Sequence, residues 1–149
     1  MAFRILWVEN DTMLALDAAI GDAGYILDHA YFLSEADELL KKNVYDVVII
    51  DDLMAIEPED IAVGYTGVET ARGNEAGLAF YRRHREDFEK MQAGVLVNSV
   101  LGKEIDMKNK FVALGLHEKN FLYKVSEANV SYLLQHVERV LREKGKRRG

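Results

Sequence analysis

Four places in the sequence carry acidic, amide, hydroxyl or amine side chains directly after short apolar runs. They are Glu9 with Asn10, Asp51 with Asp52, Asn98 with Ser99, and Lys124. Acids of this kind suit a hard divalent cation such as Mg²⁺, which prefers oxygen ligands. A cation, a lysine and a hydroxyl brought together suit a phosphoryl group. The residue types therefore indicate metal-assisted phosphoryl chemistry, if the fold brings the four places together.

The apolar runs before these side chains predict the strands that would position them. Residues 47–50 are β-branched throughout, which is typical of a strand buried on both faces. Further strand patterns cover residues 3–8, 25–30, 94–97 and 120–125, and helical patterns lie between them. The alternation predicts an α/β fold: a doubly wound, five-stranded parallel sheet with helices on both faces, in three layers. The carboxyl ends of such strands share one edge, where ligands bind.

Composition excludes several classes of site and protein. The chain has 149 residues, which fits one domain, and a net charge of -6, which argues against a nucleic-acid binder. It contains no cysteine, and its four histidines lack the spacing of metal ligands. No apolar run approaches the ~20 residues of a membrane span, and the N-terminus has no signal-peptide pattern. We expect no membrane partner and a reducing, cytoplasmic setting.

Two stretches outside the strand ends bear on the site. Residues 56–76 contain the only proline, three glycines and no sustained period, which predicts a long loop with room for a short turn of structure. Residues 82–87 (RRHRED) read as a solvated, charged helix face. Ser34 and Asp37 resemble a helix capping box, although that motif prefers Glu or Gln at its last position.

The motifs, in their order, resemble the response-regulator receiver domain, the CheY-like, flavodoxin-like fold of two-component signalling. ILWVEN resembles the strand that ends in an acidic pair, and DVVIIDDLMA the phosphoacceptor motif D-x-x-M-P. VLVNS resembles the hydroxyl-bearing strand end, and FLYK the strand end that carries a lysine. The resemblance covers nearly the whole chain. It implies a single receiver domain over residues 1–142, an inserted loop at about 56–76, and a basic tail over residues 143–149.

The resemblance implies a phosphoacceptor and a metal site. Asp51 matches the aspartate that a histidine kinase or phosphotransfer protein phosphorylates. Glu9 and Asn10 match the acidic pair that binds Mg²⁺, and Asp51 and the backbone carbonyl of Leu53 would complete the site. An aspartyl phosphate would alter protein contacts by adding charge and acceptor oxygens.

The resemblance also implies a switch. Lys124 matches the lysine that contacts the phosphoryl group. Ser99 matches the switch hydroxyl, unless a one-residue shift places Asn98 there. Phe121 matches the aromatic switch residue, with plain core packing as the alternative. Asp52, on the other face of its strand, is expected to be a cap or a solvated acid.

The sequence departs from the receiver pattern at the metal pair and in the loops. Asn10 replaces an acid, which removes a charge from the metal site and weakens it. Ala55 and Val125 replace prolines, and the segment 56–76 adds roughly 18 residues, long against usual loops. Within this segment Arg72 could reach a phosphoryl group. Four acids there could add metal ligands: Glu57, Glu59, Asp60 and Glu69.

Three functions remain open. The first is a receiver that is phosphorylated on Asp51 and signals through protein contacts, which is not an enzyme beyond self-phosphorylation and slow dephosphorylation. The second is an atypical receiver used as a phosphorylation-independent interaction module. The third is a small Mg²⁺-dependent phosphohydrolase, which is disfavoured because Leu53 stands where that class would have a second acid. The kinase, the output protein and the oligomeric state, a dimer included, stay open.

Overall fold

The structure is a computed structural model that describes residues 2–73, 75–99, 105–123 and 129–146. Its centre is a five-stranded, fully parallel sheet in the order β2-β1-β3-β4-β5. The strands are β1 (Arg4–Val8), β2 (Ile26–Ala30), β3 (Val47–Asp51), β4 (Gly94–Ser99) and β5 (Phe121–Tyr123). The predicted doubly wound α/β fold is therefore confirmed, with β3 at the centre of the sheet.

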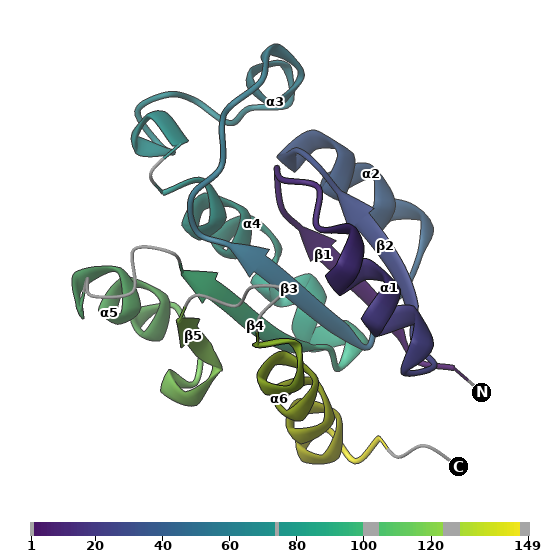
Figure 1. Ribbon diagram of the computed structural model, residues 1–149. Coiled ribbons are helices and arrows are strands. Elements are labelled where there is room, and N and C mark those ends of the chain that lie inside the picture. The colour runs from purple at the N-terminus through teal and green to yellow at the C-terminus, as the bar shows by residue number, and fades with distance from the viewer. Residues whose placement is uncertain (1, 74, 100–104, 124–128, 147–149) are drawn as a thin grey trace.

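Helices cover both faces of the sheet (Figure 1). The α-helices are α1 (Leu14–Asp22), α2 (Leu33–Lys42), α3 (Pro58–Ala62), α4 (Ala76–Met91), α5 (Ile105–Ala113) and α6 (Val130–Glu143), and the short 3₁₀ helices are η1 (Ala71–Gly73) and η2 (Glu118–Asn120). Helices α1 and α6 pack on one face, and α2, α4 and α5 on the other. Among the described residues, no helix combines the length and apolar character needed to span a membrane.

Alternation along β3 divides the core between the two faces. Val47 and Ile49 pack with the cluster under α1 and α6, whereas Val48 and Ile50 pack with the cluster under α2 and α4. Every residue of β3 is buried, as the unbroken apolar run predicted. The two acids that follow this run therefore start toward opposite faces of the sheet.

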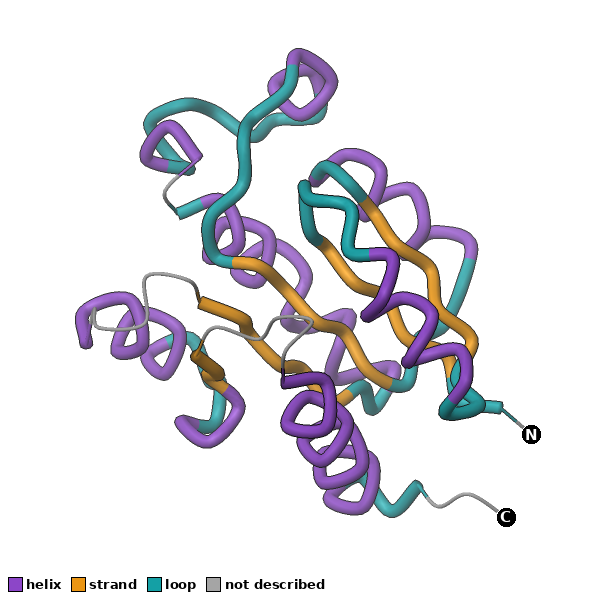
Figure 2. The backbone as a smooth tube through the Cα atoms, in the orientation of Figure 1, coloured by secondary structure: helices purple, strands orange, loops and turns teal. Residues whose placement is uncertain are grey.

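The segment 56–76 is packed against the domain and has structure of its own. It contains α3 and η1, and Tyr65 within it is completely buried. Helix α3 begins with a capping box in which Glu57 and Asp60 accept each other's backbone N–H groups. The tube in Figure 2 shows the segment leaving β3, running past the end of α2 and returning to α4. The segment contains the short structure for which the sequence left room, but its packing against α2 and α4 is a feature that its sequence period does not reveal.

The start of α2 is capped by this segment. Helix α2 begins at Leu33 with Phe32 at the N-cap position, so Ser34 and Asp37 do not form the predicted capping box. Instead, the backbone N–H of Ser34 donates to Asp60 Oδ1 of the segment over 2.7 Å. A distant carboxylate thus supplies the cap that a local side chain usually supplies.

Candidate functional site

A pocket of about 340 Å³ lies at the carboxyl ends of β1 and β3. Its walls come from the β1–α1 turn, the residues that follow β3, and the end of the segment 56–76. It is lined by Glu9, Asn10, Asp11, Met13, Asp51, Leu53, Met54, Ala55 and Gly73. Two of the four predicted strand ends therefore meet in one pocket, as expected for the carboxyl edge of a parallel sheet.

Two buried carboxyl groups, those of Glu9 and Asp51, face each other in this pocket. Glu9 is 3% exposed and Asp51 is 4% exposed. Burial, a hydrogen bond with Glu9 and the charge of Glu9 raise the pKa of Asp51 to about 10. The backbone N–H of Leu53 donates to Asp51 Oδ1 over 3.2 Å, which opposes this increase and orients the carboxyl group. The Glu9–Asp51 pair therefore favours one shared proton over two negative charges at neutral pH, and a positive charge in the pocket would reverse this preference.

Asn10 forms two hydrogen bonds to neighbouring loops. Its Nδ2 donates to the carbonyl oxygen of Tyr31, and its Oδ1 accepts the backbone N–H of Ala55, each over 2.8 Å. The amide oxygen predicted to ligate Mg²⁺ is thus engaged with Ala55, and only its second lone pair faces other partners. In this structure Asn10 is a link between loops in the wall of the pocket.

The register between β3 and β4 separates Asn98 from Ser99. Asp51 pairs with Asn98, so these two side chains share a face of the sheet. The next positions share the opposite face, where Ser99 Oγ donates to Asp52 Oδ2 over 2.6 Å. The alternative assignment, with Asn98 next to Asp51, fits this register. Ser99 instead forms its hydrogen bond with Asp52.

Asp52 is fully buried, so the expectation of a solvated acid is wrong. It does point away from Asp51, as alternation predicted. Helix α4 covers its position: the backbone N–H of Gly77 donates to the Asp52 carbonyl oxygen over 3.3 Å. A Cβ atom at Gly77 would lie 2.2 Å from the carbonyl oxygen of Asp51, so only glycine permits this close approach.

The predicted aromatic switch residue, Phe121, and the predicted phosphate-binding lysine, Lys124, have different outcomes. Phe121 is buried, and its ring centre lies 5.9 Å from that of Phe111 on α5. This is the packing that the core alternative for Phe121 predicted. Lys124 lies outside the described residues, as does the side chain of Arg72 in the segment 56–76.

The donor atoms of the pocket suit a hard cation in part. Glu9 and Asp51 supply two buried carboxyl groups that repel one another when both are ionised, and a divalent cation would relieve that repulsion. Leu53 lines the same pocket and offers a backbone carbonyl. Within the described ranges, no three His, Cys, Asp or Glu side chains are grouped so as to hold a metal ion. The pocket therefore offers two carboxyl groups and one backbone carbonyl to a hard cation such as Mg²⁺.

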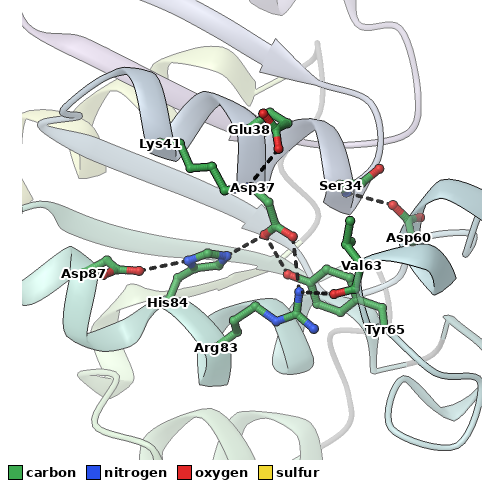
Figure 3. A network of polar contacts seen from close by, with 10 residues as sticks. All are labelled: Ser34, Asp37, Glu38, Lys41, Asp60, Val63, Tyr65, Arg83, His84 and Asp87. Atoms are coloured by element: carbon green, nitrogen blue, oxygen red, sulfur yellow. Dashed lines mark hydrogen bonds and ion pairs between the residues drawn. The ribbon is translucent and has the colours of Figure 1, made fainter.

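A second polar cluster lies away from the pocket, where α2, α4 and the segment 56–76 meet (Figure 3). Asp37 accepts hydrogen bonds from Tyr65 Oη over 2.8 Å and from Arg83 Nη1 over 3.2 Å, and it also pairs with His84 Nε2. The Arg83 guanidinium stacks 3.6 Å from the centre of the Tyr65 ring. Arg83 and His84 both pair with Asp37, and the His84 side chain is only 12% exposed, which corrects the prediction that residues 82–87 form only a solvated face.

The sequence contains a weak signal for this cluster. Asp37 occupies a position that would point inward on α2, and a buried acid requires partners. Its partners Tyr65 and Arg83 lie 28 and 46 residues further along the chain. Single-sequence patterns do not report contacts at that separation, so the partners were missed.

Solved structures similar to this chain include receiver domains and response regulators. A response regulator from Thermotoga maritima has a TM-score of 0.68 and 22% sequence identity, with 95% of this chain and 99% of that chain covered. The receiver domain of the Francisella response regulator 1452 has a TM-score of 0.68 and 19% identity, with 95% and 98% covered. The beryllofluoride-activated NtrC4 receiver domain dimer has a TM-score of 0.70 and 22% identity, with 95% and 98% covered.

These similarities define the class of fold. The chain has the fold of response-regulator receiver domains, as the order of its strand-end motifs predicted. No family model matches the sequence, and the search of curated proteins finds no match.

Proposed function

We propose that this chain is a two-component receiver that accepts a phosphoryl group on Asp51. The observation that carries the proposal is the position of Asp51, buried next to Glu9 at the carboxyl end of the central strand and open to a pocket. A histidine kinase or a phosphotransfer protein would supply the phosphoryl group. The receiver unit would comprise residues 1–142, with 143–149 as a basic tail.

The reaction follows from the groups around Asp51. An Asp51 carboxylate oxygen attacks phosphorus in line, the new O–P bond forms, and the bond from phosphorus to the donor breaks. Mg²⁺, held by Glu9, Asp51 and the Leu53 carbonyl, would neutralise charge on the phosphoryl oxygens when bound. Leu53 N–H holds the carboxyl group in place. Asn98 shares a face of the sheet with Asp51, and in this proposal its amide would donate a hydrogen bond to the product.

The raised pKa of Asp51 makes this reaction depend on a cation. A protonated carboxyl group is a poor nucleophile, and Asp51 stays protonated at neutral pH while only Glu9 faces it. Cation entry would lower the pKa of Asp51 and release its proton. Aspartyl phosphate formation should therefore be undetectable in chelator at pH 7.

Intact-mass measurement tests the proposal. The protein is incubated with Mg²⁺ and acetyl phosphate at pH 7, and a gain of one phosphoryl group is expected. Asp51→Asn should abolish the gain, whereas Asp52→Asn, which alters the neighbouring acid on the other face, should retain it. An adduct that survives in Asp51→Asn would refute the assignment, and continuous phosphate release over many turnovers would favour a phosphohydrolase.

One observation favours the second candidate, a phosphorylation-independent interaction module. The oxygen of Asn10 is engaged with Ala55, so Glu9, Asp51 and the Leu53 carbonyl remain of the predicted metal ligands. In that case the wild type would show no adduct and no Mg²⁺ binding by calorimetry at millimolar concentrations.

A further inference from the structure

The position of Asn10 in the pocket wall requires a side chain that donates one hydrogen bond and accepts another, as an amide does. Asn10 donates to the Tyr31 carbonyl and accepts from the Ala55 N–H at the same time. A carboxylate can accept but cannot donate, and it would repel the Tyr31 carbonyl oxygen. Each of its two partners is the start of a chain of contacts that leads away from the pocket.

The first chain of contacts runs through Tyr31 to α2. The backbone N–H of Tyr31 donates to Glu35 Oε1 over 2.8 Å, which ties the β2–α2 turn to the first turn of the helix. One residue before Glu35, the N–H of Ser34 donates to Asp60 of the segment 56–76 over 2.7 Å. One turn further, Asp37 accepts from the buried Tyr65 hydroxyl. The turn held by Asn10 is therefore connected to the segment through α2.

The second chain of contacts runs through Ala55 into the same segment. Ala55 follows Met54, whose backbone N–H donates to the Gly73 carbonyl over 3.1 Å. Gly73 has a φ of +96°, and a Cβ atom there would lie 2.4 Å from the Met54 carbonyl oxygen. This contact closes the neck of the segment, and Met54, Ala55 and Gly73 all line the pocket.

We propose that these contacts form one closed ring in which Asn10 is a positioning residue. The ring passes from Asn10 through Tyr31, α2, the segment 56–76 and its neck, and returns to Asn10. Since the ring supplies part of the pocket wall, binding of Mg²⁺ with a phosphoryl group at Asp51 and docking of the segment on α2 and α4 stabilise each other. This coupling rests on the proposed function, and it makes the docked segment the part of the surface that reports the state of Asp51.

The ring predicts that a change far from the pocket alters ligand affinity. Tyr65→Phe removes the hydroxyl donor to Asp37 but keeps the ring packed. Tyr45→Phe is the matched control, because buried Tyr45 also donates its hydroxyl to a carboxylate, that of Asp28, over 2.7 Å and outside the ring. Calorimetric titration of the full chain with Mg²⁺, and with Mg²⁺ plus beryllium fluoride, should show about fivefold or greater weakening in Tyr65→Phe relative to Tyr45→Phe. Equal affinities in the two variants would overturn the coupling.

A second measurement needs no ligand at Asp51. Asn10→Asp removes the donor to Tyr31, and hydrogen exchange at the Ser34 amide, which is held by Asp60, should accelerate. Asn120→Asp is the control. Asn120 Oδ1 accepts a hydrogen bond from Arg139 of α6, on the face of the sheet opposite to α2, and the substitution keeps an acceptor oxygen at this position. An unchanged Ser34 exchange rate in Asn10→Asp would refute the ring. If the wild type fails to bind beryllium fluoride, the proposed function fails, while the exchange result still decides whether the ring exists.

Discussion

Replacing Asp51 by Asn should stabilise the protein at neutral pH in the absence of divalent cations. The pKa of Asp51 is about 10 in the folded protein and near its ordinary value of 3.8 in the unfolded chain. The folded state therefore binds a proton that the unfolded state has lost, and stability falls as pH rises from about 4 toward 10. Asn keeps the shape and hydrogen-bonding capacity of the protonated acid without this cost.

The size of the gain in stability follows from the interval between pH 7 and the pKa of Asp51 in the unfolded chain. Each pKa unit corresponds to about 1.4 kcal/mol, and roughly three units separate pH 7 from the unfolded pKa, so the upper bound is about 4 kcal/mol. The shared proton and partial opening of the pocket reduce that value, and we expect a gain of about 1–3 kcal/mol at pH 7. Little gain should remain at pH 4, where Asp51 is protonated in the folded state and half protonated in the unfolded chain.

Urea unfolding monitored by circular dichroism checks this prediction between pH 4 and pH 8 in chelator. Asp11→Asn serves as the control, because Asp11 is an exposed acid that lines the same pocket. Added Mg²⁺ should narrow the difference, because it stabilises the ionised wild type and not Asp51→Asn. A destabilised Asp51→Asn at pH 7, or a gain that does not grow with pH, would show that Asp51 is not held protonated by burial and Glu9.

Three further substitutions test other parts of the structure, each by urea unfolding. Gly77→Ala should lower stability by about 2 kcal/mol or more, because the new Cβ would lie 2.2 Å from a backbone oxygen; a neutral effect would contradict the close approach of α4 to β3. Asp60→Ala should cost about 1–2 kcal/mol, since the backbone N–H groups of Ser34 and Glu57 lose their acceptor, and Glu59→Ala, at an exposed neighbour, should cost much less. Ser99→Ala should lower the free energy of unfolding by about 1–3 kcal/mol, because buried Asp52 loses the hydroxyl donor. Adduct formation on Asp51 should be unchanged. Loss of the adduct would instead support the switch role first assigned to Ser99.

The sheet and the central acid could be predicted from the sequence because their signals are local. An unbroken β-branched run marks a strand buried on both faces, and the acid at its end must lie at the carboxyl edge of a parallel sheet. Glu9 and Asp51 meet in the pocket for this reason. These arguments need only the type and order of residues along the chain.

The choice between Asn98 and Ser99 could not be made from the sequence. A shift of one residue in register exchanges the two faces of a strand, and VLVNS gives no local feature that fixes its pairing with β3. The burial of Asp52 depends on the same register, because Ser99 reaches it only when Asn98 is opposite Asp51. The packing of residues 56–76 depends on Asp37, Tyr65 and Arg83, which are too far apart in the chain for a periodic pattern to connect them.

The neck at Met54 and Gly73 has a consequence for how this domain can be altered. Three residues after the end of β3, the backbone N–H of Met54 donates to the Gly73 carbonyl over 3.1 Å, so the two ends of the segment between them lie side by side. A stretch whose ends touch can be extended at a small cost in loop-closure entropy, without stretching β3 or displacing α4, provided that Asp60 and Tyr65 keep their contacts with α2. This position is therefore a natural grafting point. A reporter peptide or a binding loop placed between residues 55 and 73 would sit at the rim of the pocket with both of its ends already held together.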